Sequence, residues 1–478
     1  MHSVPQLKIK SQEEIMDLIV TINDAVNNFV WGVPAIAMIL ITGIFVTVKL
    51  DFLQFKNIGY LFSRTIKKAF TKKDEGEKVK GEVTSFQAAM MSISAIVGSG
   101  NIAGCATAIV AGGPGAIFWM WIAALVGMAT KTAEIALGIK YREERPDGTI
   151  DGGPMYYISK GMKCKWLGVF MSVCVIFYAI VISGIIDINT MAVVLDESFS
   201  IPAVGTGIFF AILTGICIFG SAKRVGKVCE YLAPFMGGAY ILCGLAIIIL
   251  NITQVPGAFA LIIKAAFTPR GVTGGAVGSM FIAMRYGFAR GIFSNEAGVG
   301  SAAMVHCNTA VEHPMEQAVW GSVEVFLDTI LVCTVSGLAV ILSGLWTGSD
   351  LDGARLVMAA FDMLLPGNFG SLIVTGAVIL FGFSCLITFN TYVERGATFI
   401  FGEKCRIFVR IIWVAFVFIG AISGESIVWD IADTVNGIII FPNLLAIWFL
   451  SKELVAMKKE YTDPDIAAYR KAKKELSK

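Results

Sequence analysis

The sequence has little charge for its length. Of its 478 residues only 15% are Asp, Glu, Lys or Arg, whereas 56% are hydrophobic. A soluble domain carries about 25% charged residues, so this chain lacks the polar surface that water requires on all sides. The net charge of +2 also gives no basis for binding nucleic acid. The composition instead indicates a protein of the lipid bilayer.

Residues typical of catalytic and metal centres are also scarce. The chain has three histidines, His2, His306 and His313, and no HExxH pattern. Its ten cysteines are scattered, which suits buried or reduced thiols rather than a disulfide framework. The segment 76–83 has Glu82 where a phosphate-binding loop requires lysine. No nucleophile stands with a base, so we expect neither an ATP-driven pump nor an enzyme.

Apolar runs long enough to cross a bilayer recur along the chain. A spanning helix needs about 20 residues. Backbone polar groups must be paired within lipid, and because the sequence shows no strand-like alternation, helices are left to pair them. The sequence therefore predicts an all-α integral membrane protein with eleven transmembrane helices. The predicted spans are 29–48, 84–112, 114–139, 166–194, 202–221, 230–252, 274–308, 317–345, 369–393, 406–424 and 428–451. We also expect an amphipathic surface helix within 50–80 and a short external helix within 350–366.

Lysine and arginine gather in alternate loops. The loops after the first, third, fifth and ninth spans and the C-terminal tail are basic, whereas the intervening loops are acidic or bare. The loop with Lys264 and Arg270 fits this alternation less well. Because basic loops stay in the cytoplasm, we expect a multi-pass protein of the plasma (inner) membrane. Its N-terminus would lie outside and its C-terminus inside.

Two predicted spans are longer than a crossing requires, and both contain paired glycines. Span 84–112 holds Gly98-Ser99-Gly100-Asn101, and span 274–308 holds Asn295-Glu296-Ala297-Gly298-Val299-Gly300. Glycine in a helix interior costs roughly 1 kcal/mol per residue, so both helices are expected to break. The alternative is a purely structural role, in which the glycines only allow close helix packing.

These two spans lie five spans apart, so they cross the membrane in opposite senses. Two interrupted spans at corresponding places indicate an inverted repeat of five plus five helices, with the transported ligand bound at the breaks. The expected organisation is a polar segment 1–28, an extra helix with a basic segment 29–83, repeats 84–252 and 253–451, and a basic tail 452–478.

A broken helix offers unpaired N–H groups at one end and unpaired C=O groups at the other. An amino-acid zwitterion matches both, because its carboxylate suits the N–H end and its ammonium the carbonyl end. Sodium would need oxygen ligands from carbonyls and polar side chains. The polar side chains available for such a site are Ser94, Ser99, Asn101, Ser294, Ser384 and Thr388.

Three long motifs make the chain similar to a known family. They are Gly112-Gly113-Pro114-Gly115-Ala116-Ile117-Phe118-Trp119 and its continuation to Gly127, Gly152-Gly153-Pro154-Met155-Tyr156-Tyr157, and Arg285-Tyr286-Gly287-Phe288-Ala289-Arg290-Gly291-Ile292-Phe293-Ser294-Asn295-Glu296-Ala297-Gly298. With Gly98–Gly104, they resemble the alanine or glycine:cation symporters, also called sodium:alanine symporters. The resemblance covers most of 82–400.

The resemblance implies a site at the two breaks. Backbone groups of Gly98, Ser99 and Gly100 would bind the substrate carboxylate, and those of Phe293, Ser294 and Glu296, before Gly298, would bind the amine. Asn101 and Ser294 would hold one sodium. A second sodium would lie between two groups of oxygen atoms, the carbonyls near Ser94 and Val97 and the hydroxyls of Ser384 and Thr388 in the ninth predicted span. These partners, a small neutral amino acid, sodium and the bilayer, are compatible with a monomer.

Three positions depart from the family pattern. Cys385 stands where a threonine is usual, and thiol sulfur is a poor ligand for sodium. Phe389 stands where a tryptophan is usual, which would enlarge the substrate pocket. Asp187 stands where a glutamine is common. A carboxylate within a span is by default a functional candidate; it would be protonated, paired with a cation, part of the substrate or ion site, or solvated near the outer surface.

The function expected is sodium symport of a small neutral amino acid, alanine or glycine foremost. The alternatives are proton coupling, with Asp187 or Glu296 as the carrier, and a substrate-gated channel. Charged residues in 285–290 and at Glu324 and Asp328 would form either a network that changes partners during transport or a static buried cluster.

Overall fold

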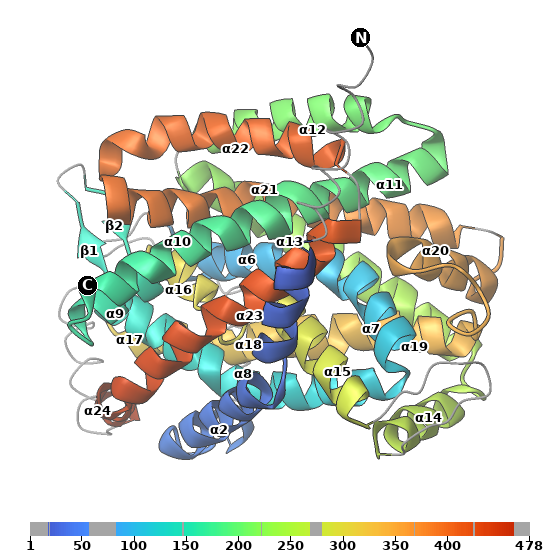
Figure 1. The fold of residues 1–478 in the computed structure, drawn as a ribbon, viewed down its shortest axis with the longest axis horizontal. Helices are drawn as coiled ribbons and strands as arrows, with labels where there is room; N and C mark the ends of the chain where they lie inside the picture. The colour runs from blue at the N-terminus through green and yellow to red at the C-terminus, as the bar shows by residue number, and fades with distance from the viewer. Residues whose placement is uncertain are drawn as a thin grey trace, which may run out of the picture.

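The computed structural model describes residues 18, 20–56, 83–145, 148–220, 222–267, 280–367, 369–423 and 426–462. These residues are almost entirely helical (Figure 1). A short hairpin of β1 (Glu143–Glu144) and β2 (Ile150–Asp151) is the strand structure named within this part of the chain. The prediction of an all-α membrane protein thus agrees with the described architecture.

Helices of the first half follow the predicted spans closely. The bounds are α2 Val33–Lys49, α3 Leu53–Lys56, α6 Ser85–Ile96, η2 Gly100–Gly104, α7 Cys105–Gly112, α8 Gly115–Lys140, α9 Pro154–Lys160, α10 Lys165–Val181, η3 Ile182–Asp187, α11 Ile188–Phe199, α12 Ala203–Ile218, α13 Ala222–Leu250 and α14 Val255–Phe267. The α14 helix occupies a stretch that the sequence left as a loop. Most of the amphipathic helix predicted within 50–80 falls outside the described residues.

The second half contains shorter pieces around its own break. The bounds are α15 Met280–Asn295, α16 Ser301–His306, α17 Pro314–Ala318, α18 Trp320–Val325, η4 Phe326–Cys333, α19 Thr334–Ser343, α20 Gly353–Leu364, α21 Gly370–Phe401, η5 Glu403–Cys405, α22 Arg406–Ala421, α23 Ser426–Phe449 and α24 Ser451–Thr462. The α20 helix lies within the predicted external segment 350–366.

Seven described helices, or eight if one bent pair is counted as a span, are long and apolar enough to cross a membrane. The bent pair is Ser85–Ile96 with Gly100–Gly112, at an angle of 51°. Large apolar side chains such as Phe209, Phe235 and Phe408 stand exposed on outer helices, where water would make them costly and lipid would not. The chain is thus a multi-pass membrane protein, and the count of eleven stays a prediction.

Helix α8 crosses the lower part of the view in Figure 1 and packs against both parts of the second broken helix, α15 and α16. Small residues allow this approach. A Cβ added to Gly127 would lie 2.9 Å from the Ala297 Cβ, and one on Gly138 would lie 2.6 Å from the Ala303 Cβ. The α12 and α22 helices form an outer layer beyond α21, so the breaks lie at the buried centre.

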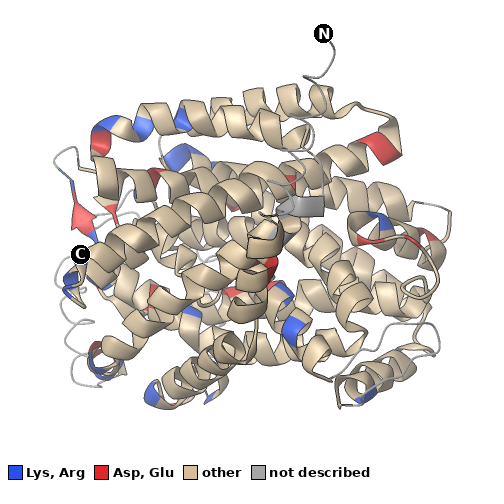
Figure 2. Ribbon diagram, in the orientation of Figure 1, with Lys and Arg blue, Asp and Glu red and all other residues tan. Residues whose placement is uncertain are grey.

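Charged residues are few along the helices and gather toward one end (Figure 2). At that end Asp151 accepts bonds from Arg145, Arg395 and Arg406, with N–O distances of 3.0, 3.1 and 3.1 Å. Lys140 pairs with Glu453 at 2.7 Å. Described parts of the loops after the third and ninth predicted spans and the start of the tail therefore lie together at this end.

Candidate functional site

The first break separates α6 from η2 at Val97–Ser99. The α6 helix begins at a capping box in which Thr84 and Gln87 bond each other, both at 3.1 Å. At the break, the Gly98 N–H donates to Asn101 Oδ1 at 2.8 Å. The Ser99 N–H and hydroxyl both donate to Asp187 Oδ1, at 3.2 and 2.5 Å. Two N–H groups that the resemblance assigns to a substrate carboxylate are therefore held by side chains.

The second break runs from Glu296 to Gly300, where the backbone turns through positive φ at Glu296 (56°), Gly298 (101°) and Gly300 (84°). The N–H groups of Gly298 and Gly300 both donate to Glu134 Oε1, at 2.8 and 3.2 Å. On the other side of the break, Lys131 Nζ donates to the Asn295 carbonyl at 2.8 Å. One turn of α8 thus places a carboxyl group at the N–H end and a lysine side chain at the C=O end.

Lys131 and Glu134 were not singled out from the sequence. The signal that could have found them is a pair of opposite charges, three residues apart, inside the apolar span 114–139. Such charges within a span are expensive and are retained for a reason. Lys131 also lies 3.6 Å from Glu324, and both side chains are fully buried.

The two breaks lie against each other. A Cβ on Gly100 would lie 2.8 Å from Phe293 Cδ1 and 3.5 Å from the Ser294 Cα. Asp328 joins them: Asn101 Nδ2 donates to its Oδ1 at 2.6 Å and the Ser294 hydroxyl to its Oδ2 at 2.8 Å. The structure therefore brings together both side chains predicted for the first sodium and adds a carboxylate to them.

The predicted second ion site gathers at the end of α6. Ser384 Oγ donates to the Ser94 carbonyl at 3.0 Å. Cys385 Sγ lies 3.3 Å from the Ser94 carbonyl oxygen and 3.9 Å from that of Val97. Thr388 Oγ1 lies instead 3.7 Å from the sulfur of Cys229. The thiol of Cys385 thus occupies the place where the carbonyls converge.

An aromatic cluster surrounds Glu296. Its carboxylate accepts bonds from the Tyr178 hydroxyl at 2.8 Å, the Ser301 hydroxyl at 2.5 Å and the Tyr392 hydroxyl at 3.2 Å. Phe389 stacks on Tyr178, with ring centroids 6.0 Å apart. Phe389, predicted to border the substrate, therefore packs into this buried cluster and is only 1% exposed.

Asn101, Asp187 and Asp328 share a backbone feature. Each lies in a π-helical segment, η2, η3 or η4 respectively. Such segments shift the direction of side chains and are frequent at functional sites. Among the described residues no cluster of three or more His, Cys, Asp or Glu side chains is arranged to hold a metal, so an ion here would depend on carbonyl and hydroxyl oxygens as well.

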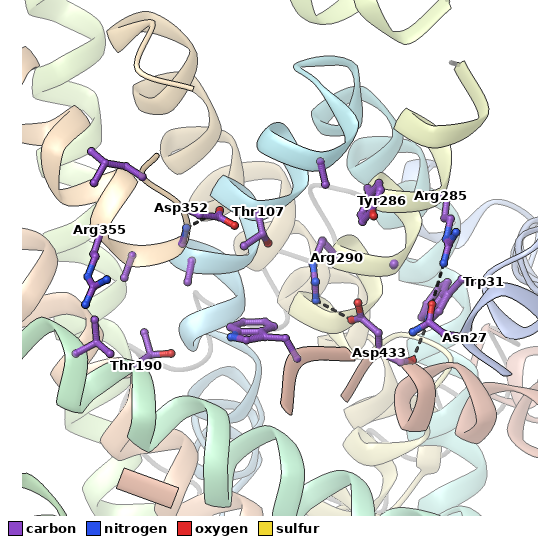
Figure 3. A pocket seen from close by; sticks show the side chains of 18 of the residues that line it. Asn27, Trp31, Thr107, Thr190, Arg285, Tyr286, Arg290, Asp352, Arg355 and Asp433 are labelled. Atoms are coloured by element: carbon purple, nitrogen blue, oxygen red, sulfur yellow. Dashed lines mark hydrogen bonds and ion pairs between the residues drawn. The ribbon is translucent and has the colours of Figure 1, made fainter. Parts of the chain in front are cut away.

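A cavity of about 710 Å³ opens beside the breaks (Figure 3). At its wall Arg290 pairs with Asp433 at 2.7 Å and lies 5.0 Å from the ring centre of Trp429. Trp429 packs in turn against Phe293 in a tilted arrangement, with ring centroids 5.3 Å apart. The cavity is lined by Thr107 and Thr190 but by none of the predicted site residues. The Arg290–Asp433 ion pair and the contact between Phe293 and Trp429 therefore separate the cavity from the breaks.

The charged residues for which the sequence left a changing network or a static cluster open pair in two separate groups. Arg290 binds Asp433 of α23, and Arg285 donates to Asn27 Oδ1 at 2.9 Å. Glu324 instead bonds His306 at 2.9 Å and Ser92 at 2.7 Å. The arginines thus belong to the cavity wall, and Glu324 belongs to a separate buried cluster.

The fold matches solved transporters at low sequence identity. MhsT in complex with L-phenylalanine matches with a TM-score of 0.56 and 14% identity, over 80% of this chain and 99% of that one. A Na⁺-coupled sialic acid symporter matches with a TM-score of 0.55 and 12% identity, over 84% and 86%.

Closer relatives are found by sequence. The Sodium/alanine symporter AgcS of Methanococcus maripaludis is 40% identical over 94% of this chain and 98% of its own length. The probable sodium/glutamine symporter GlnT of Bacillus subtilis is 34% identical over 94% and 91%. The model of the sodium:alanine symporter family matches residues 16–475. The chain is a sodium-coupled amino-acid transporter and not an enzyme, and it belongs to the sodium:alanine symporter family.

Proposed function

We propose that the chain imports a small neutral amino acid, alanine or glycine foremost, by sodium symport with alternating access. The observation that carries this proposal is the contact between the two breaks. Gly100 lies against Phe293 and Ser294, so a ligand between them would meet N–H groups of one break and C=O groups of the other. A zwitterion with a small side chain suits so close an approach.

The first ion would bind at Asp328. This carboxylate is fully buried and bonds Asn101, Ser294 and Thr329. No Lys, Arg or His of the described chain lies within ion-pair distance of it. A buried carboxylate without a cation is costly, and sodium bound beside Asn101 and Ser294 would remove that cost. We add Asp328 to the two ligands implied by the resemblance.

The remaining site residues have stated places in this proposal. Ser99 and Gly98 face the substrate carboxylate, Glu296 and Gly298 fix the shape of the second break, and Phe389 with Asp187 borders the centre. The two interrupted helices belong to the repeats 84–252 and 253–451, which have opposite orientations in this proposal. The basic end of the molecule faces the cytoplasm, with the N-terminus outside.

The cavity bounded by Arg290 and Asp433 would be the outer approach to the site. Opening the ion pair and the Phe293–Trp429 contact would connect it with the breaks. One sodium crossing the membrane supplies about 2.3 kcal/mol per 100 mV. Since about 1.4 kcal/mol corresponds to a tenfold concentration ratio, one or two ions suffice for useful accumulation.

The test is uptake of radiolabelled alanine and glycine into proteoliposomes that contain the purified full chain. We expect saturable accumulation with an inward sodium gradient and none without sodium. Asn101→Leu should abolish the sodium stimulation, whereas Asn251→Leu, a partly buried asparagine at the end of α13, should retain it. Unchanged sodium stimulation in Asn101→Leu would remove the first ion site from the proposal.

The same assay separates the alternatives. Uptake that persists in sodium-free buffer and follows an inward pH gradient would establish proton coupling. Flux that only equilibrates the amino acid, with no accumulation against its gradient, would establish a channel. A panel of amino acids competing with alanine defines the substrate and shows whether Phe389 admits larger side chains.

A further inference from the structure

Asp187 is a buried carboxylate with only half of its bonding capacity used. The side chain is 2% exposed. Its Oδ1 accepts from the N–H and hydroxyl of Ser99, whereas its Oδ2 has no hydrogen-bond partner in the described chain. No Lys, Arg or His among the described residues forms an ion pair with it. An unpaired charge at the centre of a membrane protein is expensive.

The end of α6 carries oxygen atoms with the opposite need. A helix leaves its last carbonyls without intrahelical partners. Here the Ser94 carbonyl accepts from the Ser384 hydroxyl at 3.0 Å and lies 3.3 Å from the Cys385 thiol, whereas the Ala95 carbonyl has only the thiol, also at 3.3 Å, as its side-chain donor, and a thiol is a weak donor. The buried Ser94 hydroxyl has no hydrogen-bond partner in the described chain. These are the oxygen atoms of an acceptor-rich site that lacks a strong positive group.

The two features meet at Gly98. A Cβ built there would lie 2.7 Å from Cys385 Sγ and 3.4 Å from Asp187 Oδ1. The Asp187 carboxyl group, the Ser99 hydroxyl bonded to it and the end of α6 thus lie together beside Gly98. Asp187 and Cys385 are also two of the three positions at which this sequence departs from the family pattern. Nothing in the sequence indicates that these two side chains lie close together.

We propose that Asp187 is a ligand of the second coupling ion, a sodium held between the Asp187 carboxylate, the Ser99 hydroxyl and the carbonyls at the end of α6. The carboxylate replaces the hard oxygen that Cys385 does not provide. A proton on Oδ2 would neutralise Asp187 but leave the Ala95 carbonyl with its weak thiol donor, whereas sodium would serve both groups. This inference rests on the proposed function and moves Asp187 from the substrate site to the ion site.

An order of binding follows. Asp187 already holds the Ser99 N–H, so an incoming substrate carboxylate would meet a like charge there. Sodium bound at Asp187 would cancel that repulsion, because an opposite charge within about 4–6 Å favours the ionised form of both carboxylates. Sodium should therefore bind first.

The test compares Asp187→Asn, which keeps the shape of the side chain, with Asp196→Asn, an exposed aspartate on the same continuous helix. Sodium is titrated against the purified full chain, first without substrate by tryptophan fluorescence and then by alanine binding. We expect Asp187→Asn to raise the half-saturating sodium concentration by about tenfold or more, with Asp196→Asn unchanged. Alanine affinity at saturating sodium should change far less.

Cys385→Thr provides a second, independent variant. A hydroxyl at this position adds a hard oxygen, so the half-saturating sodium concentration should fall, and it should partly recover in Asp187→Asn/Cys385→Thr. An unchanged sodium response in either single variant overturns the inference. So does a loss confined to alanine affinity, which would make Asp187 a substrate ligand, or one confined to pH dependence, which would make it a proton carrier. A wild-type protein that binds sodium but no amino acid defeats the proposed function alone.

Discussion

The two helix breaks differ in the source of their bonding partners. At the second break, Glu134 and Lys131 from one turn of α8 hold the N–H and C=O ends, and Asn443 Nδ2 donates to Glu134 Oε1 at 2.7 Å and to the Gly298 carbonyl at 2.8 Å. At the first break, the N–H groups are held by Asn101 and Asp187, and no Lys, Arg or His of the described residues forms an ion pair with Asp187. Glu134 and Asp187 each keep one carboxyl oxygen without a hydrogen-bond partner in the described chain.

This difference separates a fixed region from an exchangeable one. The second break has a lysine and a carboxyl group of α8 bonded to its two ends, so we expect it to be the more rigid side of the proposed site. The first break has no cation paired with Asp187 among the described residues, so we expect ligand and ion to exchange there. In the proposed alternating access, we expect motion mainly around the first break and the cavity beyond Arg290.

The largest expected effect comes from Lys131→Met. Removing one partner of a buried charge pair costs about 3–5 kcal/mol; here the Asn295 carbonyl would lose its lysine donor and Glu324 would keep only His306 as an ion-pair partner. We expect a large fall in melting temperature and in the yield of monodisperse protein. Lys165→Met, at an exposed lysine, is the matched control. Equal melting temperatures for the two variants would show that the second break is not held from α8.

Gly100→Ala should affect ligand binding more than folding. The new Cβ would press on the Phe293 ring and toward the Ser294 backbone, and overpacking of this kind costs about 1–3 kcal/mol. We expect weaker alanine binding by calorimetry with a smaller change in melting temperature. Gly237→Ala, where a Cβ meets open space, is the control. Intact binding in Gly100→Ala would mean that no ligand lies between the breaks.

Gly298→Ala should show the reverse pattern. The φ of 101° is strained for any side chain, and such strain costs about 1–3 kcal/mol. We expect a lower melting temperature with sodium affinity retained, because the second break is structural. A selective loss of sodium binding without loss of stability would erase the distinction between the two breaks.

The smallest effect is expected far from both breaks, at Lys140 and Glu453. Partial burial raises the pKa of Glu453, but hydrogen bonds from Lys140 and Tyr141 lower it by more than burial raises it. The pKa of Glu453 therefore lies below its ordinary value of 4.5. Its contribution to stability is then present above pH 4.5 and is lost as the pH falls through the lowered pKa. Glu453→Gln should cost less than about 1 kcal/mol near pH 7, and its difference from wild type should vanish in acid. A constant difference across this pH range would contradict this assignment.

The sequence predicted more of the fold than of the site. Long apolar runs placed the helices within a few residues, and paired glycines at 98–100 and 298–300 marked both breaks. The α14 helix was missed because Lys264 and its short apolar run resembled a loop. Glu134 and Lys131 were missed because their role depends on which helix lies beside the second break, and periodicity within one helix carries no such information.

Apolar length and glycine spacing alone determined a multi-pass helical protein with two interrupted helices, because lipid forces every backbone group to pair locally and glycine weakens that pairing. Only the tertiary structure decided which side chains complete the breaks. Three π-helical segments turn Asn101, Asp187 and Asp328 toward the centre, and Cys385 meets the end of α6 from a helix 290 positions away. Electrostatic pairing in a low-dielectric interior depends on distances of a few ångströms, which are fixed by packing between helices and not by position along the chain.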